Sequence, residues 1–437
     1  MKRISKLTKL ASLCALTVTA AGASNFSGSL YYTNQQLNNK KLSPVVVNHV
    51  IDADVSWDNL KKKKNHQKFK ASARMNDKGA TMISIEEASL NYKLQDGGRA
   101  RFGRYAIDWA PLDDIWGTGI INNRKNFDLV DHGNEGVIGL NAKFKLGKNW
   151  AIEGFGSYLY VPELNPMIEE EDGKLTSKSE WAELPPAYAN LGQGGTVAPI
   201  NYTLNKPKLA DIVFKPSYGI SGGLDSKHWI AKGFYMHKPE NTFRVSATVS
   251  TNASAGVIDA QIYPELYNEN IFGGQMSYRN KSFQVDTMIL TVRPESTPQS
   301  SALVRRYLTI ETRRQKEDYF MTGFTRKKKV FSWGVYYLHL FSGAPAGDDT
   351  LGNKPKWSRA IKTKFSLEIL KDARWKFDMT HDVEKEDTVL STGVEYDLAR
   401  GFKSELGIRA ISAPNDGTYW APFRGNDAVY VKLGHVF

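Results

Sequence analysis

The last eleven residues, Asp427–Phe437, read DAVYVKLGHVF and alternate between two kinds of side chain. Successive side chains of a β-strand point to opposite sides, so every second residue shares a face. The apolar face carries Val429, Val431, Leu433 and Phe437. The other face carries Ala428, Tyr430, Lys432 and Gly434. Chain ends usually fray, so a strong strand here is unusual for a soluble domain. A closed membrane barrel needs one, because its last strand pairs with its first and leaves no open edge in lipid.

Two preceding segments show the same alternation and are joined by a short turn. Thr388–Leu398 and Phe402–Ala410 each place apolar side chains on one face and charges of both signs on the other. An ordinary antiparallel sheet with one solvated face shows this pattern too. Similar segments of about 9–12 residues recur along the chain, with short turns alternating with long loops, which favours a transmembrane barrel.

The number of strands follows from the length of the chain. We count roughly 21 alternating segments, but an odd number cannot leave both termini on the periplasmic side. The weakest segments lie within Asn241–Leu266 and Asp318–Leu340. At roughly 23 residues per strand and loop, the chain predicts about 18 strands, within a range of about 16–20. We therefore expect one all-β domain, residues 24–437, forming an antiparallel up-and-down barrel with a water-filled lumen.

The first 23 residues predict a secretory signal peptide. Lys2, Arg3, Lys6 and Lys9 precede an apolar run from Leu10 to Ala20, and Ala21-Gly22-Ala23 supplies small residues for cleavage. The only cysteine, Cys14, lies in this leader. Beyond it no apolar run is long enough for a membrane helix, and the mean hydropathy is −0.43. The 20 Tyr, 20 Phe and 10 Trp residues suit two interfacial girdles of a barrel.

Two long loops are expected, Asp108–Glu135 and Pro162–Leu209. Loops of this length are usually functional or disordered. The first carries apolar residues that are costly in water, while its irregular backbone cannot enter lipid. We therefore predict that it folds into the barrel and narrows the pore; the alternative is an outer cap formed with the second loop. The candidate constriction residues are Asp108, Trp109, Asp113, Asp114, Trp116, Arg124 and Asp128.

The strand faces turned away from lipid carry more basic than acidic side chains. Charged rings of this kind set the selectivity of pores, so the excess predicts a preference for anions. Many of these side chains are also expected to pair across strands. The predicted pore-lining bases are Lys68, Lys70, Arg74, Arg99, Arg101, Lys143, Lys145, Arg305, Arg313, Lys362, Lys364, Arg374, Lys376, Lys403 and Arg409.

Other kinds of chemistry find little support in the sequence. The eight histidines have no paired spacing for a metal, and Glu169–Asp172 is better explained as a solvated acidic loop than as a calcium site. No hydrolase or phosphate-loop motif occurs, so we expect no enzyme and no cofactor. The basic turns Lys61–Lys64 and Lys327–Lys329 do not indicate nucleic-acid binding, because secretion removes that partner.

Two stretches resemble known families. The ending at Phe437 resembles the closing strand of Gram-negative outer-membrane barrels, in which a terminal Phe is an assembly signal, although His435 departs from the pattern. The segment from Gly103-Arg104 through Trp109 and Trp116-Gly117 to Phe127-Asp128 resembles large bacterial porins, including alginate-export-like barrels. These resemblances imply an outer-membrane location, contact with lipid and lipopolysaccharide, and insertion by the barrel-assembly machinery; an oligomer is compatible with them.

The function expected from these observations is diffusion of small hydrophilic solutes, preferentially anions, through a porin-like channel. Two alternatives remain open at this stage. The barrel could be a dedicated transporter of an acidic glycan, or a structural or adhesive surface barrel that uses Pro162–Leu209 to bind a partner.

Overall fold

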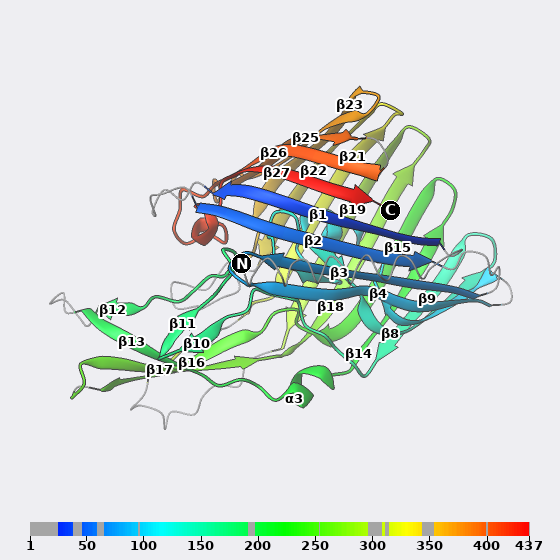
Figure 1. Ribbon diagram of the computed structural model, residues 1–437. Coiled ribbons are helices and arrows are strands. Elements are labelled where there is room, and N and C mark those ends of the chain that lie inside the picture. Colours follow the sequence, from blue (N-terminus) through cyan, green and yellow to red (C-terminus); the bar gives the residue numbers. More distant parts are fainter. Residues whose placement is uncertain are drawn as a thin grey trace.

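The computed structural model is a closed antiparallel barrel of 18 strands (Figure 1). The structure describes residues 25–37, 46–58, 65–94, 97–190, 197–252, 254–295, 308–310, 314–342, 354–398 and 401–436. The predicted signal peptide, residues 1–23, and the last residue, Phe437, lie outside these ranges. The barrel strands are β1 (Asn25–Leu37), β2 (Val46–Asp58), β3 (Asn65–Asn76), β4 (Thr81–Lys93), β5 (Arg99–Tyr105), β8 (Val137–Leu146), β9 (Trp150–Ser157), β14 (Ser217–Asp225), β15 (Trp229–Pro239), β18 (Asn268–Arg279), β19 (Phe283–Pro294), β21 (Glu317–Lys327), β22 (Phe331–Ser342), β23 (Arg359–Leu370), β24 (Ala373–Asp382), β25 (Thr388–Asp397), β26 (Phe402–Ser412) and β27 (Ala428–Val436).

The first and last strands close the barrel. β1 pairs antiparallel with β27, from Ser29 opposite Val436 to Leu37 opposite Ala428. Within this seam the ring of Tyr31 lies over Gly434, where any side chain would overlap it. An aromatic ring covering a glycine on the neighbouring strand fills space that the glycine leaves open. The predicted up-and-down barrel of about 18 strands is confirmed.

The two ends of the barrel differ. At one end, which we call the short-turn end, connections such as 147–149, 226–228 and 371–372 join the strands, and β27 ends there (Figure 1). At the other, the long-loop end, lie connections 106–136, 158–216 and 240–267. The first of the two long loops predicted from sequence is thus a few residues longer than expected, and the second begins four residues earlier and ends seven residues later than expected.

A second sheet lies outside the barrel at the long-loop end. Its strand order is β12-β13-β17-β16-β20, with β12 (Tyr188–Asn190), β13 (Val197–Leu204), β16 (Arg244–Asn252), β17 (Val257–Glu265) and β20 (Leu308–Ile310). The hairpin β10 (Glu169–Glu171) and β11 (Lys174–Thr176) packs on it, and the Tyr202 amide donates to the Gly173 carbonyl (2.7 Å). We call these five strands the accessory sheet; they extend to the lower left in Figure 1.

Of the two weak segments of the strand count, one belongs to the accessory sheet and the other to the barrel. Asn241–Leu266 holds β16 and β17, which pair with each other but do not join the barrel. Asp318–Leu340 holds β21 and most of β22, which both span the barrel.

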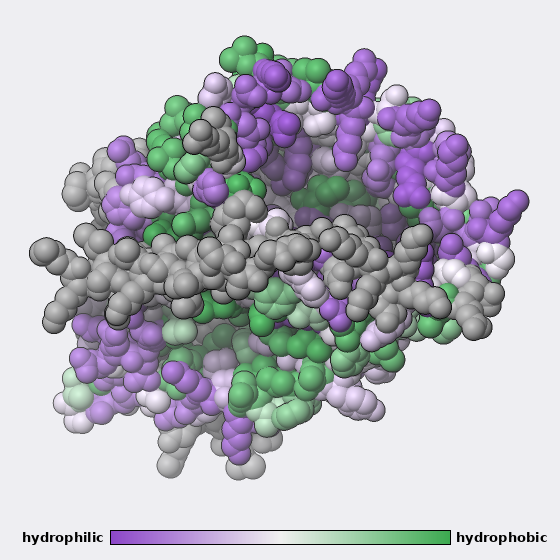
Figure 2. Space-filling model, turned by 45° about the vertical axis from the view of Figure 1, so that its right-hand side comes forward, coloured by the Kyte–Doolittle hydropathy of each residue, from purple (hydrophilic) through white to green (hydrophobic). Residues whose placement is uncertain are grey.

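The outer wall is apolar and ringed with aromatic side chains. Ile83, Ile289 and Leu406 are 60–71% exposed on this surface. Near the short-turn end, aromatic rings on successive strands touch; neighbouring centroids lie 4.8–5.8 Å apart along the series Trp229, Tyr278, Phe283, Phe324 and Trp333. Figure 2 shows a broad hydrophobic region on the outer surface and hydrophilic residues around the recess at one end. In the described ranges no helix has the length and apolar character to cross a membrane.

Candidate functional site

The connection 106–136, which we call the inner loop, lies inside the barrel. It contains helix α2 (Pro111–Trp116), β6 (Asn123–Lys125) and β7 (Gly133–Glu135). Trp109, Leu112 and Ile121 are completely buried. They share one apolar cluster with inward-facing residues of the barrel wall, namely Met236, Ile271, Met288, Leu290, Met321 and Leu338. Each such buried side chain contributes roughly 1.5–3 kcal/mol, so the inner loop is held firmly against this side of the wall.

Sequence reasoning missed the apolar inner wall. Met288 and Leu290 on β19 point inward, while Ile289 between them is 61% exposed on the outside. A strand that is apolar on both faces loses the clean alternation by which we located strands. A strand with apolar side chains on both faces could have revealed this wall, because in a barrel an apolar inner face must be covered by another part of the chain.

Hydrogen bonds within the inner loop fix its shape. The Asp113 carboxylate accepts from the amides of Ile120 (3.0 Å) and Ile121 (2.9 Å). Asn122 exchanges two hydrogen bonds with the backbone of Ile107 (2.9 and 2.8 Å). Arg124 donates to the Asp113 carbonyl (2.8 Å). Asp113 and Arg124 therefore organise the loop and do not face the lumen.

Ion pairs tie the inner loop to the other side of the wall. Asp128 contacts Arg409 of β26, and its carboxylate lies 3.6 Å from Arg74 of β3. Burial raises the pKa of Asp128, but the two guanidinium groups outweigh burial and bring the pKa to about 2. Lys125 contacts Glu86 of β4 in the same way. These two inner-loop charges are thus neutralised by the wall and contribute little to the field in the lumen.

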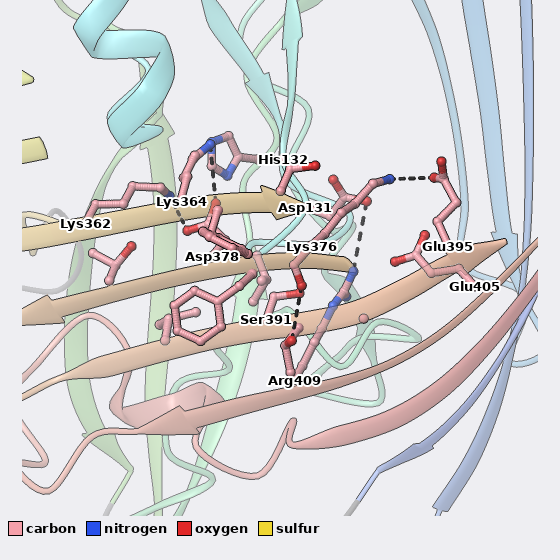
Figure 3. Close-up of a pocket in the computed structure, with 18 of the residues that line it drawn as sticks. Asp131, His132, Lys362, Lys364, Lys376, Asp378, Ser391, Glu395, Glu405 and Arg409 are labelled. Atoms are coloured by element: carbon pink, nitrogen blue, oxygen red, sulfur yellow. Dashed lines mark hydrogen bonds and ion pairs between the residues drawn. The ribbon is translucent and has the colours of Figure 1, made fainter. Parts of the chain in front are cut away.

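Beside the inner loop lies a cavity of about 580 Å³, the lumen cavity. Its loop side carries Trp116, Leu129, Val130, Asp131 and His132. Figure 3 shows Asp131 and His132 on one side of the cavity and charged residues of neighbouring strands on the other. Nine basic residues line it: Arg74, Lys327, Lys356, Lys362, Lys364, Lys376, Lys403, Arg409 and Lys432. The four acidic ones are Asp131, Asp378, Glu395 and Glu405.

Two carboxylates of the wall are each shared by two lysines. Asp378 lies 3.2 Å from Lys362 and 3.3 Å from Lys364. Glu395 lies 2.5 Å from Lys376 and 3.7 Å from Lys403. The group at Asp378 keeps one net positive charge. Lys403 also lies 2.9 Å from Asp397, so the group at Glu395 is neutral, and the pairing reduces the positive potential of this wall without cancelling it.

A short segment of the second long loop crosses the mouth at the long-loop end. Glu180 accepts a hydrogen bond from the side chain of Asn48 on β2 (2.7 Å). Its carbonyl accepts another from Asn426 (2.9 Å), and Trp181 packs on Phe423 with centroids 5.8 Å apart. The first loop therefore lies inside the barrel, as predicted, and does not form the outer cap considered as the alternative; only part of the second loop lies over the mouth.

Comparisons with known proteins find matches among solved structures only. No family model and no curated protein matches the sequence. Among solved structures, OccAB3 of Acinetobacter baumannii has 8% identity and a TM-score of 0.49 over 94% of this chain and 98% of its own. OccD3 (OpdP) of Pseudomonas aeruginosa has 8% identity and a TM-score of 0.44 over 94% and 91%. Salmonella typhi OmpF in complex with daunomycin has 8% identity and a TM-score of 0.43 over 94% and 97%.

The closed antiparallel topology decides the fold class. The fold is a closed 18-stranded antiparallel β-barrel. Identities this low carry no information about solutes, so any selectivity of the barrel has to be argued from its own lumen.

Six of the predicted pore-lining bases line the lumen cavity, and the others lie elsewhere. The six are Arg74, Lys362, Lys364, Lys376, Lys403 and Arg409. Outside the cavity are Lys68, Lys70, Arg99, Arg101, Lys143, Lys145 and Arg374. Of these, Lys70 pairs with Glu86, Lys143 lies 3.4 Å from Asp225, and Arg101 donates to Asn91 (2.6 Å). Arg305 and Arg313 lie outside the described residues.

The predicted constriction residues also lie in different places, some at the lumen cavity and some away from it. Trp116 lines the lumen cavity, whereas Trp109 is buried against the wall. Asp108 is exposed at the start of the inner loop. Burial and the neighbouring Asp113 raise the pKa of Asp114 to about 6. Within the described ranges, no cluster of three His, Cys, Asp or Glu side chains could hold a metal ion.

Proposed function

We propose that this porin-type barrel is a channel of the bacterial outer membrane that passes small hydrophilic solutes by diffusion and favours anions. The observation that carries the proposal is the lining of the lumen cavity, which contains nine basic and four acidic side chains. An excess of fixed positive charge in a narrow, water-filled space raises the local concentration of anions and lowers that of cations.

The outer wall supports the membrane location. Its apolar side chains and aromatic series match a surface that contacts lipid, and long loops of such barrels face the cell exterior. We further propose that the barrel is delivered by a cleaved signal peptide, is inserted by the barrel-assembly machinery, and contacts lipopolysaccharide. Diffusion through such a pore requires no catalysis, and the sequence holds no catalytic motif.

The test is the reversal potential of the purified barrel in a planar bilayer separating two KCl concentrations. An anion-preferring channel shifts the potential toward the equilibrium potential of chloride. A potential shifted toward that of potassium contradicts the proposal. Adding acidic sugar polymers to the same recordings tests the glycan alternative, which requires a block by one polymer and none by neutral polymers of equal size.

The accessory sheet favours a second candidate, a surface barrel that binds a partner. Five strands outside the barrel exceed what a diffusion pore needs, and their apolar core of Tyr202, Ala260 and Ile262 makes them a folded unit. A barrel that inserts into bilayers but conducts no ions would support this candidate over the channel.

A further inference from the structure

A second water-filled space, the outer cavity of about 250 Å³, lies toward the long-loop end of the barrel. Its lining includes Glu163, Asn241, Glu269 and Arg314. Asn241 lies two residues after the end of β15, and Glu269 is the second residue of β18, so this cavity lies at the long-loop end of those strands.

Three chain segments lie between the two cavities and contribute residues to both. Gly117 lines the outer cavity and Trp116 the lumen cavity. In the second segment Tyr419 lines the outer cavity and Trp420 the lumen cavity. In the third segment Pro355 lines the outer cavity and Trp357 the lumen cavity, and Lys356 between them lines both. Among the described residues, Lys356 is the one that borders both spaces.

The Lys356 ammonium group has no carboxylate partner in the described part of the chain, where no acidic oxygen lies within 4.0 Å of it. It donates to the carbonyl of Leu129 on the inner loop (3.2 Å) and lies 5.1 Å from the ring centre of Trp420. Lys362, Lys364, Lys376 and Lys403 each share a carboxylate. Lys327 and Lys432 also have no carboxylate within 4.0 Å among the described residues, but they line only the wider lumen cavity.

We propose that Lys356 is the residue that sets the anion preference of the channel. It holds an uncompensated positive charge at the boundary between the two cavities, which we call the passage and place on the path of the solute. A charge there acts on each solute at close range, whereas the wall lysines act across a wider and better screened space. This inference rests on the proposed function and narrows it to one side chain that sequence reasoning did not select.

The surroundings of Lys356 make its charge depend on pH. Burial and the nearby cations Arg124 and Lys362 together lower its pKa to about 7, against the opposing effect of Glu163 and Asp128. His132 of the inner loop faces the same group, and burial keeps the pKa of that imidazole well below its usual value. Burial likewise raises the pKa of Glu163 to about 7. A lysine is charged below its pKa, so the positive charge at the passage decreases as pH rises through about 7.

The experiment compares reversal potentials in a KCl gradient for the purified wild-type barrel, Lys356→Gln and Lys148→Gln. Lys148→Gln is the matched control, because it removes the same charge from an exposed turn at the short-turn end. We expect Lys356→Gln to move the reversal potential at least halfway to zero and Lys148→Gln to leave it unchanged. A Lys356→Gln barrel with the full wild-type potential overturns the inference. A wild-type barrel with no anion preference overturns the proposed function instead.

Two further measurements decide the matter should Lys356→Gln fail to assemble. The wild-type anion preference should decrease between pH 6 and pH 9, and Lys356→Arg should keep it at pH 9, because guanidinium stays charged there. A wild-type preference that does not change over this range, or that decreases equally in Lys356→Arg, assigns the selectivity to other groups and overturns the inference.

Discussion

Replacing Asp128 by Asn should release the inner loop from one side of the barrel wall while leaving the barrel intact. Asp128 is 2% exposed and pairs with Arg74 and Arg409, whose side chains are themselves largely buried. Removing one member of a buried ion pair typically costs about 3–5 kcal/mol, because the remaining charges lose their partner. The strand pairing of β3 and β26 does not involve this side chain, so the cost falls on the loop.

Single-channel recording measures the effect. A loop that detaches from Arg74 and Arg409 moves within the lumen, so the Asp128→Asn channel should show larger current fluctuations than the wild type. Asp131→Asn is the control, since Asp131 is 65% exposed and 4.0 Å from Arg409. Fluctuations and mean conductance equal to the wild type in a correctly assembled Asp128→Asn barrel would refute the anchoring role. Because the pKa of Asp128 is lowered to about 2, its stabilisation is complete above about pH 4 and is lost only as pH falls toward 2.

Three other predictions follow from the fold. Leu406 is 60% exposed on the outer wall, so Leu406→Arg should destabilise the barrel by about 2–4 kcal/mol and reduce the folded fraction measured by heat-dependent gel mobility. Glu405 faces inward, so Glu405→Gln should assemble normally. Equal loss of folded protein in both variants would contradict the assignment of the two faces. Replacing Trp109–Asn122 by a Gly-Ser linker should raise single-channel conductance severalfold in an assembled barrel, and an unchanged conductance would show that the inner loop does not narrow the pore. Deleting Phe437 should lower outer-membrane levels of the protein more than it alters conductance, and normal levels would count against its role as an assembly signal.

The barrel could be predicted from sequence because each spanning strand has two different environments. Val429, Val431 and Leu433 of β27 are 43–50% exposed on the outer surface, as the alternation predicted. The same alternation misled the strand count in β16 and β17. Ile258 and Ile262 of β17 are buried in the accessory sheet, so these strands also have one apolar and one polar face. Alternation of apolar and polar residues shows that a strand has two different faces, but it does not show which sheet the strand belongs to.

The passage between the cavities could not be predicted in this way. Trp116, Lys356 and Trp420 come from three connections far apart in the sequence, and none belongs to an alternating segment. Asp113 and Asp128 were selected as loop carboxylates facing the lumen. In the structure the Asp113 carboxylate binds backbone amides and the Asp128 carboxylate binds guanidinium groups. This difference depends on the local conformation of the loop, which cannot be read from residue type alone.

The apolar inner wall constrains the order in which the barrel is built. Helix α2 ends at Trp116, yet the wall it packs on includes Leu290, Met321 and Leu338, which are translated much later. Contacts between residues so distant in sequence form slowly, because the intervening chain must be ordered first. Until β19, β21 and β22 are in place, the inner loop has no apolar surface to dock on, and those strands present apolar side chains on both faces. The half-built barrel is therefore the species most prone to aggregation. Dependence on chaperones should be greatest for folding intermediates in which the barrel is formed only as far as β19 to β22.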